Sequence, residues 1–281
     1  MKKEILGLLI FLATLAAVSI PLVMLAIGAP TDTFSSNVTV GNSPPNITYV
    51  NNSFSINPSA ATTREVVIRF NATDNNSASD FNDATAEVNI TLDGVTRTSH
   101  TCTPEGLAGV LESWECNITI NYWEKPGNWN ITAYVEDTAG NSTMNDTYWM
   151  TVGNADHIDV IETALSFSGS AGQQNRPASE NPLTINNTGN QNYTIVNITG
   201  TVLSGGGDNI GPSNFTVNVT DGSGEGEALS TSVITIASAV IDRRTGASST
   251  EDLYFYLDIP SGIANTDYST GGSPWTIDPS V

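Results

Sequence analysis

Apolar and polar residues alternate along much of this chain with a period of two. In Val88-Asn89-Ile90-Thr91, Cys116-Asn117-Ile118-Thr119 and Trp129-Asn130-Ile131-Thr132, every second residue is apolar. Successive side chains of a β-strand point to opposite faces of the sheet, so this pattern predicts strands with one buried and one solvated face. Helical periodicity is not convincing over any segment of 12 or more residues in the first half. The sequence therefore predicts an all-β fold.

Seven strands are predicted in the first half, and turn residues separate them. The dipeptide Asp93-Gly94 indicates a hairpin, and residues 137–141 indicate a turn before the last strand. About 100 residues with seven short strands are typical of a β-sandwich, which we place at residues 44–153. The predicted strands are 46–50, 64–73, 85–92, 95–102, 114–121, 129–136 and 145–152.

Seven more strands are predicted beyond a short junction at residues 153–156, and they indicate a second β-sandwich at 156–281. Phe215, Val217 and Val219 form one inward row, and Val233–Ala237 is apolar enough to indicate a central strand. The first of these segments, 158–167, also fits one face of a helix. The predicted strands are 158–167, 182–187, 192–203, 213–220, 232–241, 252–259 and 274–278.

Three short motifs carry a resemblance to a known family. They are Pro44-Pro45-Asn46-Ile47, residues 69–74 (Arg-Phe-Asn-Ala-Thr-Asp) and residues 134–141 (Tyr-Val-Glu-Asp-Thr-Ala-Gly-Asn). Over residues 44–153 the chain resembles immunoglobulin-like modules of prokaryotic, in particular archaeal, cell-surface proteins. Residues 156–281 have a weaker likeness to modules of archaeal cell-envelope proteins. The resemblance implies a spacer or an adhesive unit.

Fifteen Asn-x-Ser/Thr sequons are present, more than twice the number that the composition predicts by chance. On a strand, Asn and Thr two residues apart share the wet face while the residue between them enters the core. The sequence therefore predicts a surface protein with N-linked glycans. The candidate acceptors are Asn37, Asn46, Asn51, Asn71, Asn75, Asn89, Asn117, Asn130, Asn141, Asn145, Asn186, Asn192, Asn197, Asn214 and Asn218.

The first 29 residues are predicted to direct export. Lys2 and Lys3 precede an almost unbroken apolar run from Ile5 to Ile27, with a cleavage signal before Ala29. The run is long enough to span a bilayer, so a cleaved signal peptide and a retained signal-anchor helix both remain open. A pilin-type helix, trimmed near its start and then retained, is a third alternative. Residues 30–43 form a polar stalk, and the remainder is predicted to be extracellular.

Net charge and hydrophobic content limit which classes of partner and of protein are expected. The chain has 281 residues, a formal net charge of −20 and a pI near 4.1. Because no basic stripe is present to follow phosphates, nucleic acid is not an expected partner. Hydrophobic residues make up 39% of the chain, which is too many for a disordered mucin-like stalk.

Cys102 and Cys116 are the two cysteines of the chain. In an exported protein such a pair predicts a disulfide. Two free buried thiols or a metal-binding pair are the alternatives, and no His or Cys cluster supports the metal.

Catalytic chemistry is hard to find in the sequence, so the chain is predicted not to be an enzyme. Neither His100 nor His157 has partners placed for nucleophilic or zinc chemistry. An envelope hydrolase with two facing carboxylates stays as a minor alternative. The loop at 74–83 instead carries oxygen ligands suited to calcium, with Asp74, Asp80 and Asp83 as candidate ligands. A second acidic, glycine-rich loop at 221–232 lacks the final Glu of a calcium-binding loop.

The sequence thus predicts a structural or adhesive protein of the cell envelope that works without a cofactor: a spacer, a surface-layer or appendage subunit, or an adhesin. Its expected partners are envelope proteins or further copies of itself, with residues 34–42 as a candidate donated strand. If the N-terminal helix is not cleaved, the membrane is a further expected partner. The main alternative is a polysaccharide- or calcium-dependent binding module. Its candidate sugar-stacking aromatics are Trp123, Tyr148, Trp149, Tyr254 and Tyr256.

Overall fold

A computed structural model describes residues 32–51, 54–222, 226–244 and 249–281. The regular structure of these residues is β, apart from two single-turn 3₁₀ helices, η1 (Ala78–Asp80) and η2 (Pro212–Asn214). This confirms the predicted all-β class. The apolar run before residue 29 lies outside the described residues. Within the described residues, no helix has the length and apolarity needed to cross a membrane.

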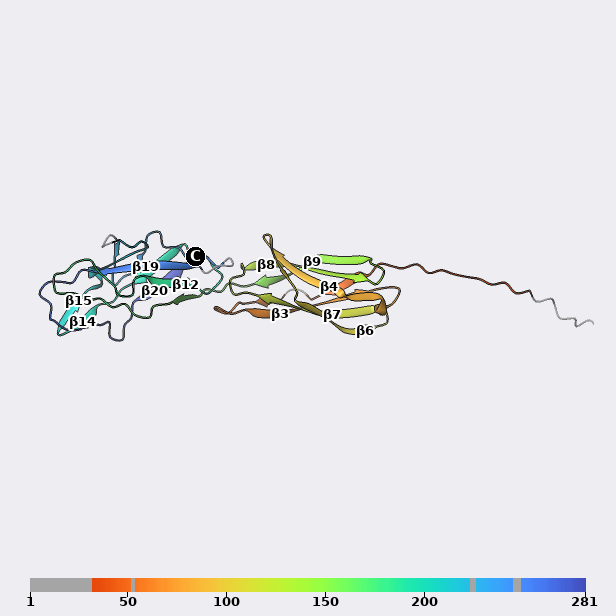
Figure 1. Cartoon of the computed structure of the whole chain (residues 1–281), viewed down its shortest axis with the longest axis horizontal. Helices are drawn as coiled ribbons and strands as arrows, with labels where there is room; N and C mark the ends of the chain where they lie inside the picture. Colours follow the sequence, from red (N-terminus) through yellow and green to blue (C-terminus); the bar gives the residue numbers. More distant parts are fainter. Residues whose placement is uncertain (1–31, 52–53, 223–225, 245–248) are drawn as a thin grey trace, which may run out of the picture. The chain divides into compact units, whose positions relative to one another are not determined.

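Nine strands make two sheets between residues 46 and 152. One sheet has the order β1-β3-β7-β6 and the other β2-β9-β8-β4-β5, and all neighbours are antiparallel except β2 and β9. In Figure 1, β3, β7 and β6 lie on one side and β4, β8 and β9 on the other, as in a β-sandwich. The strands are β1 (Asn46–Val50), β2 (Ser55–Ile56), β3 (Arg64–Thr73), β4 (Phe81–Leu92), β5 (Val95–Thr98), β6 (Thr101–Ala108), β7 (Leu111–Ile120), β8 (Gly127–Asp137) and β9 (Ser142–Val152).

The alternation in the sequence accounts for the core between these two sheets. Along β7, every second residue from Glu112 to Ile120 is buried, and the residues between them are partly exposed. Trp114 is fully buried, stacks on Phe70 of β3 at 4.9 Å between ring centroids, and meets the edge of Phe81 of β4 at 5.0 Å. One continuous cluster of buried side chains therefore joins the two sheets.

A second set of strands follows residue 157. The larger sheet has the order β10-β12-β19-β16-β17, with β11 also pairing β19; β18-β13-β20 form a second sheet, and β14 and β15 a hairpin. The strands are β10 (Ile158–Val160), β11 (Arg176–Pro177), β12 (Leu183–Asn187), β13 (Ile195–Thr199), β14 (Leu203–Gly205), β15 (Asp208–Ile210), β16 (Phe215–Asn218), β17 (Glu227–Ala228), β18 (Ile234–Thr235), β19 (Thr250–Leu257) and β20 (Thr276–Ser280).

These strands enclose a second cluster of buried residues, distinct from the first. Phe215 and Val217 are fully buried as predicted, and the next residue of that row, Val219, is partly buried. Phe255 of β19 lies near Trp275, with ring centroids 6.0 Å apart. The residues that follow β10 form no helix up to residue 170, so the alternative of a helix at 158–167 is wrong.

Several predicted strands differ from the observed ones: 158–167 is a strand only at Ile158–Val160, and 192–203 contains Ile195–Thr199 and the start of β14. Two more differ in their pairing. The segment 95–102 is divided at Ser99-His100: β5 pairs with β4 in one sheet, and β6 pairs with β7 in the other. The segment 232–241 keeps only the two residues of β18 in a sheet, at an edge, and Val233 is 65% exposed. In both cases the hydrophobic pattern is continuous along the chain, whereas the sheet pairing is not.

The residues from Asn42 onward form one contact unit, which the preceding residues do not join. Residues 32–41 have no regular structure and are exposed. The last two residues of the predicted stalk behave differently, because the Asn42 amide donates to Asp137 Oδ2 at 2.7 Å and the Ser43 N–H donates to Asn76 Oδ1 at 2.7 Å.

Candidate functional site

Three carboxylates converge at one end of the first pair of sheets. Asp74 follows β3, Asp80 ends η1, and Asp137 ends β8. One carboxylate oxygen of each lies within 4.8 Å of the others, and Asp74 and Asp137 are buried while Asp80 is partly buried. Backbone pairing explains the approach of β8 to η1, since Phe81 pairs with Asp137 in the sheet. We call these three residues the aspartate cluster.

The loop between β3 and β4 is shaped by its own short polar side chains. The Asp74 N–H donates to the Val110 carbonyl at 2.8 Å, and Asp74 Oδ1 accepts the Asn76 N–H at 2.7 Å. The other carboxylate oxygen, Oδ2, is buried and accepts no hydrogen bond from any described residue. A buried carboxylate oxygen without a partner is unusual and calls for an explanation.

The turn after β8 holds Asp137 in its charged form. Burial acts to raise the pKa of Asp137, but hydrogen bonds from the side chains of Asn141 and Asn42 and from backbone N–H groups outweigh it and lower this pKa below its usual value. Asp80 is tied to the same turn, because Thr138 donates both its hydroxyl to Asp80 Oδ1 and its N–H to the Asp80 carbonyl.

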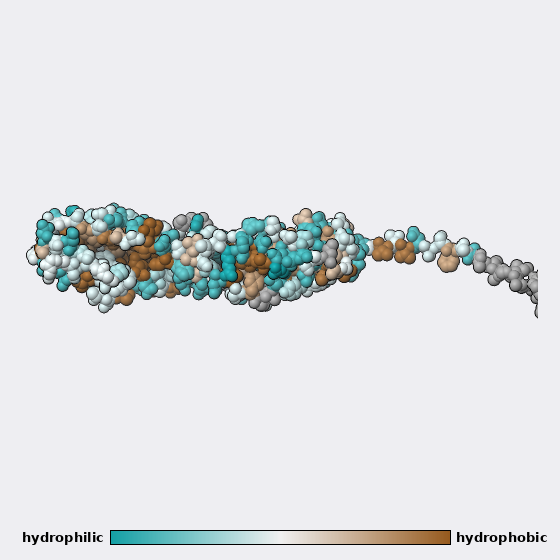
Figure 2. Space-filling model, turned by 90° about the horizontal axis from the view of Figure 1, so that it is seen from below, coloured by the Kyte–Doolittle hydropathy of each residue, from teal (hydrophilic) through white to brown (hydrophobic). Residues whose placement is uncertain are grey.

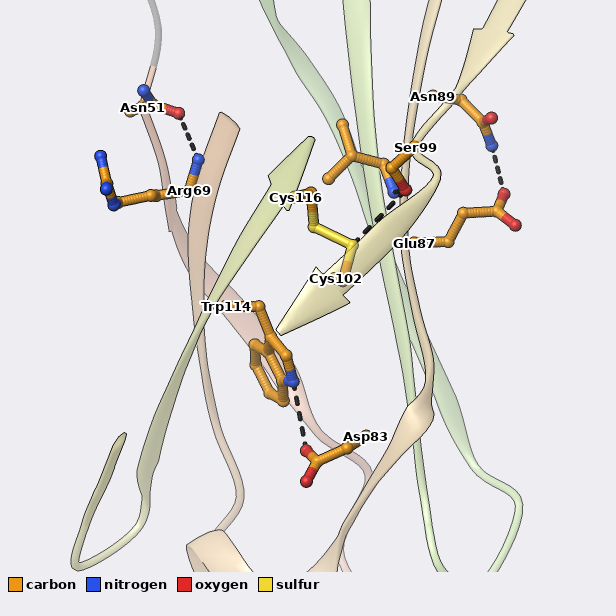
Figure 3. Close-up of a disulfide and its surroundings, with 10 residues drawn as sticks. Asn51, Arg69, Asp83, Glu87, Asn89, Ser99, Cys102, Trp114 and Cys116 are labelled. Carbon is orange, nitrogen blue, oxygen red and sulfur yellow. Dashed lines mark hydrogen bonds between the residues drawn. A yellow bond between two sulfur atoms is a disulfide. The ribbon is translucent and has the colours of Figure 1, made fainter. Parts of the chain in front are cut away.

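The structure does not bring all three sequence-predicted calcium ligands together. Asp74 and Asp80 lie in the aspartate cluster, but Asp83 is exposed and its Oδ1 accepts the indole N–H of Trp114 at 3.2 Å, as Figure 3 shows. The third carboxylate is Asp137, which is 54 residues beyond Asp83 in the sequence. Only the sheet pairing reveals it. The second candidate loop includes residues 223–225, which lie outside the described residues.

Glu112 is a second buried acid near this end of the sheets. It is 3% exposed, and burial together with the charge of Asp83 raises the pKa of Glu112 to about 7. Its side chain is therefore close to half-ionised at neutral pH. Sequence reasoning missed this residue, because it occupies an apolar position in the alternation of β7.

The predicted disulfide is present. Cys102 and Cys116 are paired residues of the neighbouring strands β6 and β7, and their bond therefore lies within one sheet (Figure 3). Cys116 is fully buried, as its place in the alternation predicts. No cysteine is free.

All fifteen sequon asparagines are exposed or partly exposed. The buried asparagines Asn187 and Asn190 are not sequon acceptors, and their side chains bind backbone groups instead. The residues between Asn and Thr behave in the opposite way: Ile90, Ile118 and Ile131 are fully buried. Every candidate acceptor thus has solvent access, while in these three sequons the middle residue anchors the strand.

An apolar cavity of about 580 Å³ opens between the two sheets of the second core. Its walls include Val160 of β10, Leu183 of β12, Ile198 of β13, Phe255 of β19 and Ile277 of β20. Strands β10 and β20 each have a single neighbour in their sheets. Figure 2 shows apolar side chains at the surface in several places on this face of the molecule. The cavity is a groove bordered by two edge strands and by loop residues, and its lining also includes the polar residues Glu162, Ser269 and Thr270.

The candidate aromatic residues do not form one stacking surface. Trp149 is 48% exposed, whereas Tyr148 packs on the first core and Tyr256 is 6% exposed, with its hydroxyl bound to Asp221. Trp123 faces Tyr122 edge-on and lies under the guanidinium of Arg244 at 4.5 Å. Tyr254 is partly buried on β19.

His100 is hydrogen-bonded to a threonine, and His157 is exposed. His100 Nε2 lies 2.7 Å from the Thr119 hydroxyl, and that hydroxyl donates its proton to Glu65 at 2.5 Å. His100 must therefore donate to Thr119 and cannot serve it as a base in this arrangement. His157 is exposed.

No protein-family model matches the chain, and no curated protein matches it. Among solved structures, the chain is similar to the secreted serine protease VesC from Vibrio cholerae, with 10% identity and a TM-score of 0.22. The match covers 80% of this chain and 51% of the protease chain, so this chain spans about half the length of that structure. A likeness at this level carries no argument about fold or activity.

Proposed function

We propose that this chain is an exported, N-glycosylated structural protein of a cell envelope, which acts through its surfaces and through association. The observation that carries the proposal is the placement of the asparagines. All fifteen sequon acceptors are accessible, and the buried Asn187 and Asn190 are not acceptors. This placement supports the proposal, because a glycan can be attached only to an asparagine that reaches the solvent.

We further propose that the two cores belong to two tandem β-sandwich domains, at 44–153 and 156–281, and that the first is immunoglobulin-like. The strand order supports this. The constant-type immunoglobulin sheets are A-B-E-D and C-F-G, with strand C′ added to the second sheet in variable types. Taking β1 as A, β3 as B and β4 as C, the observed sheets read A-B-E-D and G-F-C-C′, with the short strand β2 added parallel to G at the edge of the second sheet. The disulfide joins D to E, unlike the bridge of antibody domains between B and F.

The mass of the native protein tests the glycan part of the proposal. Protein purified from its own host is expected to exceed the mass of the polypeptide by several glycans, and enzymatic or chemical deglycosylation should remove the excess. Peptide mapping should then place the glycans at sequon asparagines. A native mass equal to that of the bare polypeptide would refute N-glycosylation.

Association is proposed to use the extended segment before Asn42. Phe34, Val38 and Val40 are 92%, 81% and 82% exposed, and their spacing puts them on one face of an extended strand. Figure 2 shows apolar side chains along this segment. The groove between β10 and β20 offers apolar walls and unpaired strand edges. Residues 34–40 of one copy are proposed to enter this groove of the next copy, which would build a filament by head-to-tail contacts.

Matched pairs of substitutions test this association. The double variant Phe34→Asp with Val40→Asp places two charges on the apolar face of the segment. The control is the double variant Thr33→Asp with Ser35→Asp, which adds the same charge on the opposite face. Electron microscopy and sedimentation of the exported protein should show assemblies for the natural chain and the control, and monomers for the first variant. Monomers of the natural chain at all salt and protein concentrations would refute assembly.

A further inference from the structure

The aspartate cluster has no basic side chain paired with it among the described residues. Asp74, Asp80 and Asp137 bring three carboxylates within 4.8 Å of one another, two of them buried. Like charges at this distance repel strongly when water is largely excluded. The four ion pairs among the described residues all involve other carboxylates, so no arginine or lysine neutralises the cluster.

Asp74 supplies an independent sign of a ligand. This residue is 0% exposed, and its Oδ2 is buried without a hydrogen-bond partner. The surrounding loop satisfies the first oxygen with the Asn76 N–H and provides nothing for the second. A bound cation would satisfy an oxygen that the described residues leave without a donor.

The other two carboxylates keep the capacity to bind a cation. Asp137 Oδ2 accepts hydrogen bonds from the side chains of both Asn42 and Asn141, whereas Oδ1 accepts one, from the Asn141 N–H, and so has a second lone pair for a cation. Asp80 accepts one hydroxyl, from Thr138, on Oδ1. The cluster therefore presents an all-oxygen, anionic donor set.

We propose that Asp74, Asp80 and Asp137 form a calcium site. Calcium binds carboxylate and carbonyl oxygens in variable geometry, often with water completing its shell. Magnesium demands a stricter octahedron, and zinc favours nitrogen and sulfur ligands, which are absent from this donor set. The site differs from the set that the sequence alone indicates, because Asp137 takes the place of Asp83.

The cation would link two segments directly, and hydrogen bonds join a third segment to them. Asp74 and Asp80 belong to the loop between β3 and β4, and Asp137 begins the turn between β8 and β9. Asn42 is hydrogen-bonded to the same Asp137, and Ser43 to Asn76 of the same loop. Calcium binding therefore stiffens the end of the sheets at which the chain enters them, and calcium removal is expected to loosen it.

Calorimetric titration of the purified, chelator-treated full chain with calcium chloride tests the proposal. We expect saturable binding with one ion per chain at concentrations up to about 1 mM, the range of extracellular calcium modules, and a higher melting temperature with calcium. Absence of binding heat together with an unchanged melting temperature at about 10 mM calcium would overturn the site. Equally tight binding of magnesium would overturn the assignment to calcium.

Isosteric variants locate the ion. Asp74→Asn and Asp80→Asn are each expected to weaken calcium binding at least about tenfold, since each removes a charged ligand. Asp83→Asn, in the same loop but outside the cluster, serves as the matched control and should bind like the natural chain. If Asp83→Asn weakened binding while Asp74→Asn and Asp80→Asn did not, the ion would lie elsewhere and the proposal would be wrong. Using two cluster variants covers the case in which one of them fails to fold.

Discussion

At the scale of the residue, Glu112 is an ionisable side chain at a buried position. Its backbone follows the alternation of β7, so its side chain turns inward beside apolar neighbours. Burial, and then the nearby charge of Asp83, raises its pKa from 4.5 to about 7. An acid with a raised pKa in the folded state destabilises the fold once it ionises, because the unfolded chain ionises it more easily.

The pH dependence of stability follows from this shift. Below about pH 4.5, Glu112 is neutral in the folded and the unfolded chain and does not affect the free energy of unfolding. Between about pH 4.5 and about 7 it ionises in the unfolded chain first, so the free energy of unfolding falls as pH rises. Above about pH 7 it is ionised in both states, and the reduction in unfolding free energy stays constant. Glu112→Gln, which cannot ionise, is expected to exceed the natural chain in unfolding free energy by up to about 3 kcal/mol at pH 8 and to equal it at pH 4.5. Urea unfolding at the two pH values measures this.

A matched control separates the effect from a general change in net charge. Glu87→Gln removes one negative charge from an exposed position in β4. It should change stability little at either pH. A gain for Glu112→Gln that is the same at pH 4.5 and pH 8 would mean that its ionisation is not the cause.

At the scale of the element, the edge strand β6 depends on its neighbour. It pairs only with β7, its register shifts between Pro104 and Gly106, and the bond between Cys102 and Cys116 fastens it. The bond closes a short loop, and the entropy that it removes from the unfolded chain stabilises the fold.

Removing this bond should therefore cost measurable stability. Cys102→Ala with Cys116→Ala is expected to lower the free energy of unfolding by about 3 kcal/mol, the chain-entropy value for a 15-residue loop. Denaturant unfolding measures the difference. The natural chain under reducing conditions should fall by a similar amount, and unchanged stability after complete reduction would contradict the entropic account.

At the scale of the whole molecule, the buried side chains form two separate clusters, one on each side of residue 155. Polar contacts join the two regions: Asn190 bonds to Gly153 and to Ala155, and Arg243 and Arg244 reach Trp123 and Tyr122. The separate core of the first region supports the proposal that it is a domain.

Independent folding is the corresponding prediction. A fragment of residues 42–153 retains the first core, the disulfide and the aspartate cluster, so it is expected to unfold in one cooperative transition with a β-type circular dichroism spectrum. Calorimetry of the fragment beside the full chain measures this. A fragment without a cooperative transition would show that the first core requires residues beyond 153.

The sequence by itself determined those features that depend on local alternation and turn chemistry. The inward rows of β7 and β16, the hairpin at Asp93-Gly94 and the pairing of Cys102 with Cys116 all follow from period-two patterns and from the small number of cysteines. The solvent access of the sequon asparagines Asn89, Asn117 and Asn130 follows from the same alternation, since the buried middle residue turns Asn and Thr outward.

Tertiary structure alone decided which segments meet. It divided residues 95–102 between two sheets, left Val233 exposed beside a two-residue edge strand, and brought Asp137 to Asp74 and Asp80 in place of Asp83. It also turned Glu112 into the core. The physical reason is that alternation states which face of a strand is buried but not which strand lies beside it. Contacts between distant carboxylates, and the burial of a single charge, are fixed only when the sheets are assembled.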